Sequence, residues 1–225
     1  MYIIMLGGPG TGKGSIGGKV AEDFNLTHIA TGDMFREEIK KQTELGKKMN
    51  EYISKGNLVP DEVVIGIVEN RLNQPDCTNG VVLDGFPRTE KQAIALKQML
   101  ESKGKKVDAA IEINVPDEDI IKRIVNRRMC SNKECGAIYN TVFSPSKVEN
   151  VCDVCGSELV KRADDNEETV RQRLAVYHKT ANELLNYYKN ENILFTIYPD
   201  IYSKTVFEDN IAQVESYLNK VKEVK

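Results

Sequence analysis

A glycine-rich segment that includes a lysine carries the clearest chemistry in this sequence. It reads Gly7-Gly8-Pro9-Gly10-Thr11-Gly12-Lys13-Gly14-Ser15 and directly follows the apolar residues 2–6. Glycines let successive backbone N–H groups turn toward one anion, and a helix that begins there adds the positive end of its dipole. The spacing fits a phosphate-binding loop, although Gly14 stands where serine or threonine is usual and the hydroxyl follows at Ser15. The segment therefore predicts a site for the phosphates of a nucleotide.

Four of the five cysteines form two pairs. Cys130 and Cys135 are separated by four residues, Cys152 and Cys155 by two, and sixteen residues lie between the pairs. Such knuckles can close a tetrahedral thiolate shell around zinc, and a full shell makes the metal structural because no position is left for water. The alternative is four reduced thiols without a metal. The acidic balance of this segment argues against a nucleic-acid-binding zinc ribbon.

Several arginines stand in marked local settings. Arg88 ends the segment Asp84-Gly85-Phe86-Pro87-Arg88, directly after a predicted strand, where α/β folds place ligand contacts. Arg123 and Arg127 are one helical turn apart and share a face. Arg36, Arg162 and Arg173 are the other arginines that we single out. Guanidinium groups bind phosphate oxygens through two parallel hydrogen bonds, so the set is suited to a polyphosphate ligand.

The elements that must position these groups alternate along the chain. Strand-like apolar runs occur at residues 2–6, 27–30, 81–84, 109–115 and 193–197, with helical patterns between them. This alternation predicts an α/β fold with a parallel sheet covered by helices. Residues 31–73 are helical in pattern without a strand, and residues 129–160 resemble a small inserted module.

Two local predictions concern helices. Asp165 is expected to cap a helix, with Glu168 completing a capping box. The stripe that follows is expected to pack in the core: Val170, Leu174, Tyr177, Ala181, Leu184 and Tyr188. Gly17 and Gly18 fall inside the first helix, where each costs ~1 kcal/mol relative to alanine, so that helix is expected to be locally weak.

Size and charge place further bounds. The chain has 225 residues with 31 basic and 34 acidic side chains, which suits one main domain and gives no basic excess for nucleic-acid binding. The N-terminus lacks a targeting pattern, and residues 2–6 are too few to span a membrane. We expect a cytoplasmic monomer whose cysteines bind metal instead of forming disulfides.

The motifs together resemble the adenylate kinase family, specifically its long form with a zinc-bearing lid. The resemblance rests on the loop at Gly7–Ser15, on Thr31-Gly32-Asp33, Gly56-Asn57-Leu58-Val59-Pro60 and Asp84–Thr89 with Gln92, and on Arg162-x-Asp164-Asp165 followed by Glu167 to Arg173. It implies the reaction ATP + AMP ⇌ 2 ADP with Mg²⁺. It also implies a P-loop core (residues 1–29, 60–125 and 164–225), a helical AMP-binding insertion (30–59) and a lid with structural Zn²⁺ (126–163).

The resemblance also implies roles for individual residues. ATP would be bound by Gly10, Thr11, Gly12, Lys13, Gly14, Ser15, Arg123, Arg127, Ile138, Tyr139 and Ile201. AMP would be bound by Thr31, Arg36, Asn57, Leu58, Val59, Gly85, Phe86, Pro87, Arg88, Gln92, Arg162 and Arg173. Lys13, Arg36, Arg88, Arg127, Arg162 and Arg173 would act on the transferring phosphoryl group, and Asp84 would orient magnesium-bound water. Zinc would be bound by Cys130, Cys135, Cys152 and Cys155.

Three other functions are weighed against this one. A kinase for UMP or CMP belongs to the same enzyme class, but Thr31, Gln92 and the cysteine-bearing lid favour AMP. A non-catalytic nucleotide sensor would not need every matching arginine. A P-loop GTPase is disfavoured because the sequence has no Asn-Lys-x-Asp segment for reading guanine.

Overall fold

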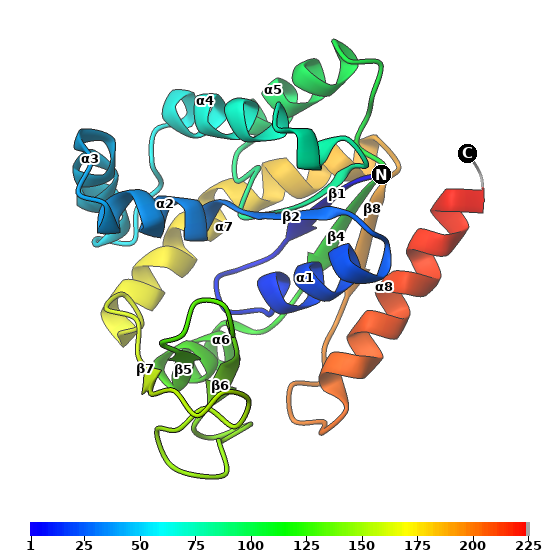
Figure 1. Cartoon of the computed structure of the whole chain (residues 1–225). Helices are drawn as coiled ribbons and strands as arrows, with labels where there is room; N and C mark the ends of the chain where they lie inside the picture. Colours follow the sequence, from blue (N-terminus) through cyan, green and yellow to red (C-terminus); the bar gives the residue numbers. More distant parts are fainter. Residues whose placement is uncertain (224–225) are drawn as a thin grey trace.

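A parallel five-stranded sheet forms the centre of the molecule in the computed structural model, which describes residues 1–223 (Figure 1). Its strand order is β2-β3-β1-β4-β8. The strands are β1 (Tyr2–Leu6), β2 (Thr27–Ala30), β3 (Val81–Asp84), β4 (Ala109–Ile113) and β8 (Leu194–Ile197). All the pairings are parallel, and Ile4 of β1 lies opposite Leu83 of β3 and Ala110 of β4. The predicted α/β class and parallel sheet are confirmed.

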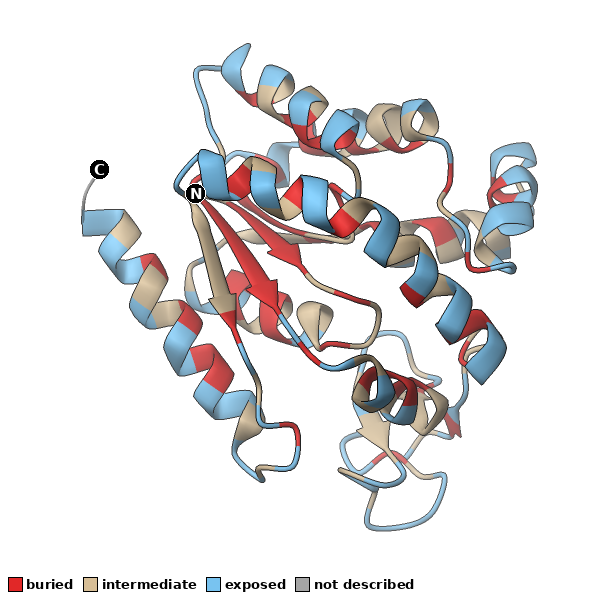
Figure 2. Cartoon of the chain, turned by 180° about the vertical axis from the view of Figure 1, so that it is seen from behind, coloured by how far each residue is buried: buried red, intermediate tan, exposed pale blue. Residues whose placement is uncertain are grey.

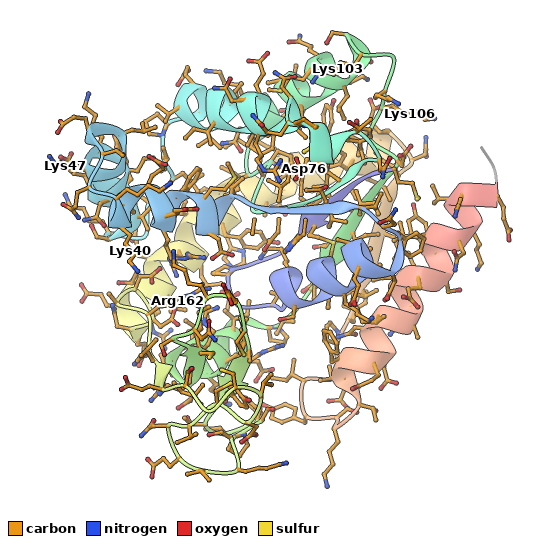
Figure 3. The ribbon with its side chains drawn as sticks, in the orientation of Figure 1. Lys40, Lys47, Asp76, Lys103, Lys106 and Arg162 are labelled. Atoms are coloured by element: carbon orange, nitrogen blue, oxygen red, sulfur yellow. The ribbon has the colours of Figure 1, made fainter. Side chains whose placement is uncertain are left out.

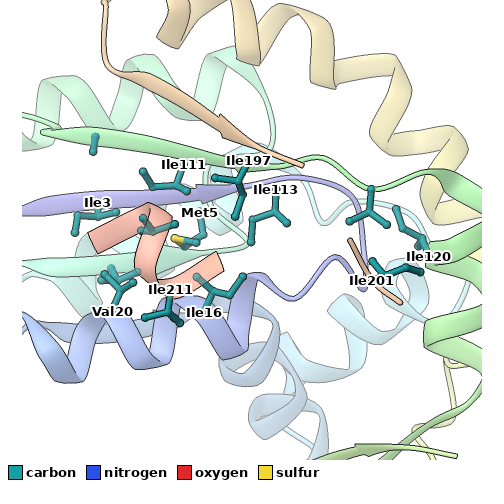
Figure 4. Packing of buried hydrophobic residues seen from close by; sticks show 14 of the residues in the cluster. Ile3, Met5, Ile16, Val20, Ile111, Ile113, Ile120, Ile197, Ile201 and Ile211 are labelled. Carbon is teal, nitrogen blue, oxygen red and sulfur yellow. The ribbon is translucent and has the colours of Figure 1, made fainter. Parts of the chain in front are cut away.

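Helices cover both faces of the sheet, which is why its strands are rich in buried apolar residues (Figure 2). Ile3 and Met5 of β1 point into one core cluster, and Ile4 and Leu6 point into the other. The first cluster includes side chains of α1 (Lys13–Asp23) and α8 (Val206–Glu223), as Figure 4 shows for Ile16, Val20 and Ile211. The second includes α4 (Asp61–Leu72) and α5 (Glu90–Glu101). The remaining helices are α2 (Thr31–Lys40), α3 (Glu44–Ile53), α6 (Asp117–Val125), α7 (Glu167–Asn190) and the short 3₁₀ turn η1 (Pro75–Cys77).

A second, three-stranded antiparallel sheet is built from the segment that the sequence singled out as an inserted module. Its order is β6-β5-β7, with β5 at Arg127–Cys130, β6 at Ile138–Asn140 and β7 at Leu159–Val160. Its apolar cluster of buried residues consists only of Cys130, Cys152 and Leu159. The helices α2 and α3 likewise extend from the main sheet between β2 and α4, as the helical pattern of residues 31–73 predicts (Figure 1).

The start of α7 differs from the prediction. The N-cap is Asn166, whose side chain accepts a hydrogen bond from the Thr169 backbone N–H at 2.9 Å, and Asp165 is not the cap. Asp165 is fully buried and its carboxylate forms an ion pair with Arg127. The capping-box prediction at Asp165 is therefore wrong by one residue, because a distant cation competes for this carboxylate. The predicted apolar stripe of α7 is buried except for Tyr177, which is half-buried.

The helix α1 was expected to be locally weak at Gly17 and Gly18, but it continues through both glycines without a break. A Cβ at Gly17 would lie 3.1 Å from Met5 Cγ and 3.3 Å from both His28 Nε2 and Val82 Cγ1. A Cβ at Gly18 would approach His28 Nδ1 only to 3.7 Å, which is ordinary contact. Gly17 thus lets the helix lie close to the sheet and to the His28 ring, whereas Gly18 has room for a methyl group.

We therefore expect opposite outcomes for the two alanine substitutions. Gly18→Ala should raise the free energy of unfolding by about 0.5–1 kcal/mol, because alanine has the higher helix propensity. Gly17→Ala should lower the free energy of unfolding, because the crowding of its methyl group against Met5 and Val82 outweighs the gain in helix propensity. Urea unfolding of the two variants beside the wild type measures the difference. Equal stabilisation by both would show that the close approach at Gly17 has no energetic weight.

Within residues 1–223, no helix combines the length and the apolar character that crossing a membrane requires.

Candidate active site

The glycine-rich loop lies between the end of β1 and the first turn of α1, as predicted. Gly7 has φ +131°, and a Cβ there would come within 2.4 Å of the Ile113 carbonyl oxygen. Gly12 precedes α1 with φ +102°. The Lys13 ammonium donates hydrogen bonds to the carbonyl oxygens of Gly7 at 2.9 Å and Gly8 at 2.6 Å, so the lysine folds back over the loop. These contacts hold one cation at the N-terminal end of α1.

The charge of Lys13 is costly in the unliganded protein. Burial, together with the positive charges of Arg88 and Arg127, lowers the pKa of Lys13 to about 8, against the opposing effect of Asp84. Lys13, Arg88 and Arg127 therefore act on one another electrostatically, although they come from three distant parts of the chain. A polyanion bound among them would relieve this repulsion.

We predict that the protein takes up protons near pH 8 when a nucleotide binds at this loop. About half of Lys13 is uncharged at that pH in the free protein, and a phosphate beside it favours the charged ammonium. Because the required form is the protonated one, affinity should fall as the pH rises through 8. Calorimetric titration of ATP in buffers of different ionisation enthalpy measures the uptake. Lys13→Arg is the control, since arginine stays charged; equal uptake by the variant would assign the protons to another group.

All six predicted arginines line the same large cavity as the loop: Arg36, Arg88, Arg123, Arg127, Arg162 and Arg173. They come from α2, the segment after β3, α6, β5, the segment after β7, and α7. In Figure 3, Arg162 lies between the small sheet and α2, and its guanidinium is 3.8 Å from the Asp33 carboxylate of α2. The predicted convergence of cations on one cleft is therefore present.

Acidic neighbours hold most of these arginines in place. Asp33 pairs with Arg36 at 2.5 Å. Asp165 receives two hydrogen bonds from Arg127, at 2.8 Å from Nε and 2.5 Å from Nη2, and Asp164 pairs with Arg173. These carboxylates were not predicted as partners of the arginines. One sequence feature could have indicated these pairs: in the segment from Arg162 to Asp165, two acidic residues follow an arginine that was predicted to bind phosphate.

Arg88, like Arg123, forms no ion pair with a carboxylate within residues 1–223. Its Nε donates to the Gly85 carbonyl oxygen at 2.8 Å. The side chain is exposed to the water of the cleft, but the surrounding protein removes part of the hydration of the guanidinium. This desolvation lowers the pKa of Arg88. The charges of Arg173 and Arg36 lower the pKa as well, and Asp84 opposes the shift. Burial also lowers the pKa of Arg162 to about 10, together with the charges of Arg127 and Arg36. The cleft therefore carries an excess of positive charge, which favours anionic ligands.

The other predicted site residues fall into three groups. The first group lines the large cavity: Gly10, Gly12, Gly14, Ser15, Asp84, Pro87, Ile138, Tyr139 and Ile201. A smaller cavity beside it is lined by Arg36, Asn57, Leu58, Val59, Gly85, Arg88, Gln92 and Arg173. Thr11, Thr31 and Phe86 line neither cavity. Thr31 is buried, and its hydroxyl donates to the Asp84 carbonyl oxygen at 3.2 Å.

The four cysteines of the inserted module come together as the spacing predicts. Their sulfur atoms all lie within 4.8 Å of one another, with 3.4 Å between Cys130 and Cys155 and 3.7 Å between Cys135 and Cys152. Four thiolates at ~2.3 Å from one zinc ion require similar separations, so the residues fit that metal. Gly136 (φ +61°) and Gly156 (φ +75°) each follow the second cysteine of a pair, which lets both knuckles turn.

A phosphate-binding loop at the carboxyl end of a parallel sheet, facing a ring of arginines, is the arrangement of P-loop phosphotransferases. The sequence model of the family described as adenylate kinase matches residues 5–193. The chain is 50% identical to the adenylate kinase of Archaeoglobus fulgidus over 99% of this chain and all of that protein. It is 53% identical to that of Caldicellulosiruptor saccharolyticus over 87% of this chain and 90% of the relative, and 48% identical to that of Clostridium tetani over 97% and 100%.

The chain therefore belongs to the adenylate kinase family, and it is a nucleoside monophosphate kinase.

Proposed function

We propose that this protein transfers a phosphoryl group reversibly between ATP and AMP to give two molecules of ADP. The observation that carries the proposal is the single cleft lined by Lys13 and the six arginines. Relatives of nearly full length that are called adenylate kinases support the choice of acceptor. In-line phosphoryl transfer needs two polyanions in register and charge neutralised on the moving group, which a ring of fixed cations supplies.

The two cavities suggest which nucleotide goes where. ATP would lie in the large cavity, with its phosphates in the loop from Gly10 to Ser15 and its base toward Arg123 and Ile201. AMP would lie in the smaller cavity, with its base toward Gln92. Arg36, Arg88 and Arg173 line both cavities and would stand where the two phosphate chains meet.

These residues would stabilise the transferring group without a covalent intermediate. Arg88, held by Gly85, and Arg127, held by Asp165, would present rigid donors to the phosphoryl oxygens. When bound with ATP, Mg²⁺ would supply further positive charge to the phosphates. Asp84 would orient water molecules bound to the metal; its carboxylate lies beside the loop, because its Oδ2 would be 3.1 Å from a Cβ at Gly14.

The domain division and the zinc site belong to the same proposal. Residues 30–59 would form the AMP-binding insertion, and residues 126–163 would form a lid that closes over ATP and excludes water from the phosphoryl group. Cys130, Cys135, Cys152 and Cys155 would hold a structural Zn²⁺ in that lid.

A coupled assay of ADP formation from Mg-ATP and each of AMP, UMP, CMP and GMP tests the reaction. We expect AMP to be the preferred acceptor by kcat/KM. Preference for UMP or CMP would make the protein the other kind of nucleoside monophosphate kinase. Binding of ATP without ADP formation from any acceptor would contradict catalysis and favour a nucleotide sensor.

A further inference from the structure

The Gln92 side chain is fixed by two partners that come from different parts of the fold. Its Nε2 donates to Asp61 Oδ1 at 2.7 Å, and its Oε1 accepts from the Arg88 backbone N–H at 2.8 Å. Asp61 is the first residue of α4, whereas Gln92 lies in the first turn of α5. Gln92 is only 2% exposed, so exchange of these partners for water is restricted.

These partners leave the amide only one orientation. A carboxylate without a proton can only accept, and a backbone N–H can only donate. Turning the amide by 180° would place its oxygen against the Asp61 carboxylate and its NH₂ against the Arg88 N–H. Both contacts would become repulsive, and a buried polar group without a partner costs about 1–3 kcal/mol. Asp61 is itself held, because its Oδ2 accepts from the Thr89 hydroxyl at 3.1 Å.

The fixed amide has one N–H and one oxygen lone pair left, and Gln92 lines the smaller cavity. The Watson–Crick edge of adenine offers an acceptor at N1 and a donor at the 6-amino group, which match that pair. A 6-oxopurine offers the reverse, a donor at N1 and an acceptor at O6. A glutamine that is free to turn could bind either edge, but one that is locked could bind only the first.

We propose that Asp61 is a positioning residue that makes this site selective for adenine over 6-oxopurines by preventing the Gln92 amide from turning. This proposal rests on the proposed function, since it takes the smaller cavity as the site of the acceptor base. Asp61 lines neither the large nor the smaller cavity, so it would act through Gln92 and not on the nucleotide directly. By fixing the amide, it would determine which edge of a purine base Gln92 can bind.

The test compares AMP with IMP as acceptors for the wild type and for Asp61→Ala. The ratio of kcat/KM for AMP to that for IMP should fall at least tenfold in the variant, chiefly through a higher KM for AMP. The kcat at saturating AMP should stay within about threefold of the wild type. Calorimetric binding of AMP and IMP in the absence of ATP should show the same loss of selectivity, which a change in the chemical step would not produce.

Three further variants separate positioning from helix packing. Glu62→Ala removes the next carboxylate of α4, which pairs with Lys91 of α5 and does not contact Gln92, so the ratio should not change. Asp61→Asn keeps an oxygen that can accept from Gln92 and should restore most of the selectivity. Asp61→Leu fills the space without an acceptor and serves in place of alanine if that variant does not fold.

The outcomes are separable. A wild-type protein that forms no ADP from ATP and AMP would overturn the proposed function. A wild type that uses AMP, with the same AMP-to-IMP ratio in Asp61→Ala or Asp61→Leu, would overturn the role of Asp61 alone. An equal fall in Glu62→Ala would also overturn it, because the effect would then belong to the contact between α4 and α5.

Discussion

Replacing Arg88 by alanine is expected to lower kcat/KM for ADP formation by about 10²–10³-fold, or about 3–4 kcal/mol of transition-state stabilisation. Arg88 lines both cavities, and its Nε bond to Gly85 aims the guanidinium without using a carboxylate. Its charge is therefore available to the transferring phosphoryl group. Steady-state kinetics with both substrates varied would show whether the loss appears in kcat, as a contact made mainly in the transition state requires.

Two further arginine variants serve as controls for the effect of Arg88→Ala. Arg88→Lys keeps a positive charge but loses the paired donors, so we expect an intermediate loss. Arg171→Ala removes an exposed arginine of α7 that pairs with Glu118 and Glu167, two exposed acids, and it should leave kcat/KM unchanged. A loss below tenfold in Arg88→Ala, or an equal loss in Arg171→Ala, would remove Arg88 from the phosphoryl-transfer site.

The parts of the fold that follow local rules could be predicted from the sequence. Central strands buried on both faces are continuous apolar runs, so the positions of β1 and β3 were predicted to the residue. The edge strand β2 is only partly buried, and its position was also predicted to the residue. The phosphate-binding loop is equally local, because its glycines and Lys13 are consecutive. The cysteine pairs could also be predicted, since each knuckle is short and carries a glycine with positive φ.

The parts that depend on distant partners could not be predicted in this way. Asp165 has the sequence environment of a helix cap, and only the fold shows that Arg127, 38 residues earlier, lies beside it. Asp61 and Gln92 are 31 residues apart and meet because α4 and α5 pack together. Gly17 looks like a weakness in α1 until the His28 ring and Val82 are placed against it. Side-chain pairing across elements leaves no periodic signal in a single sequence. The monomeric state and cytoplasmic location remain predictions.

Removal of the proposed zinc is expected to lower the melting temperature of the protein by about 6–12 °C. The cysteine-bearing module has an apolar cluster whose buried members are only Cys130, Cys152 and Leu159, too few to hold its sheet together. A contribution of ~3 kcal/mol from the metal corresponds to a shift of this size in a chain of this length. Calorimetry before and after chelation, with metal analysis of both samples, measures it.

The rate should respond far less than the stability, because a metal that has four thiolate ligands has no open position for substrate or water. We expect the folded fraction of chelated protein at 20 °C to keep its kcat within about threefold, and readded zinc to restore the melting temperature. Cys155→Ser should lose the metal and melt early, whereas Cys77→Ala should keep it, since Cys77 lies in the main core apart from the other four. An unchanged melting temperature in metal-free protein would contradict the structural role. A collapse of turnover in chelated protein that stays folded would instead place the metal in the chemistry.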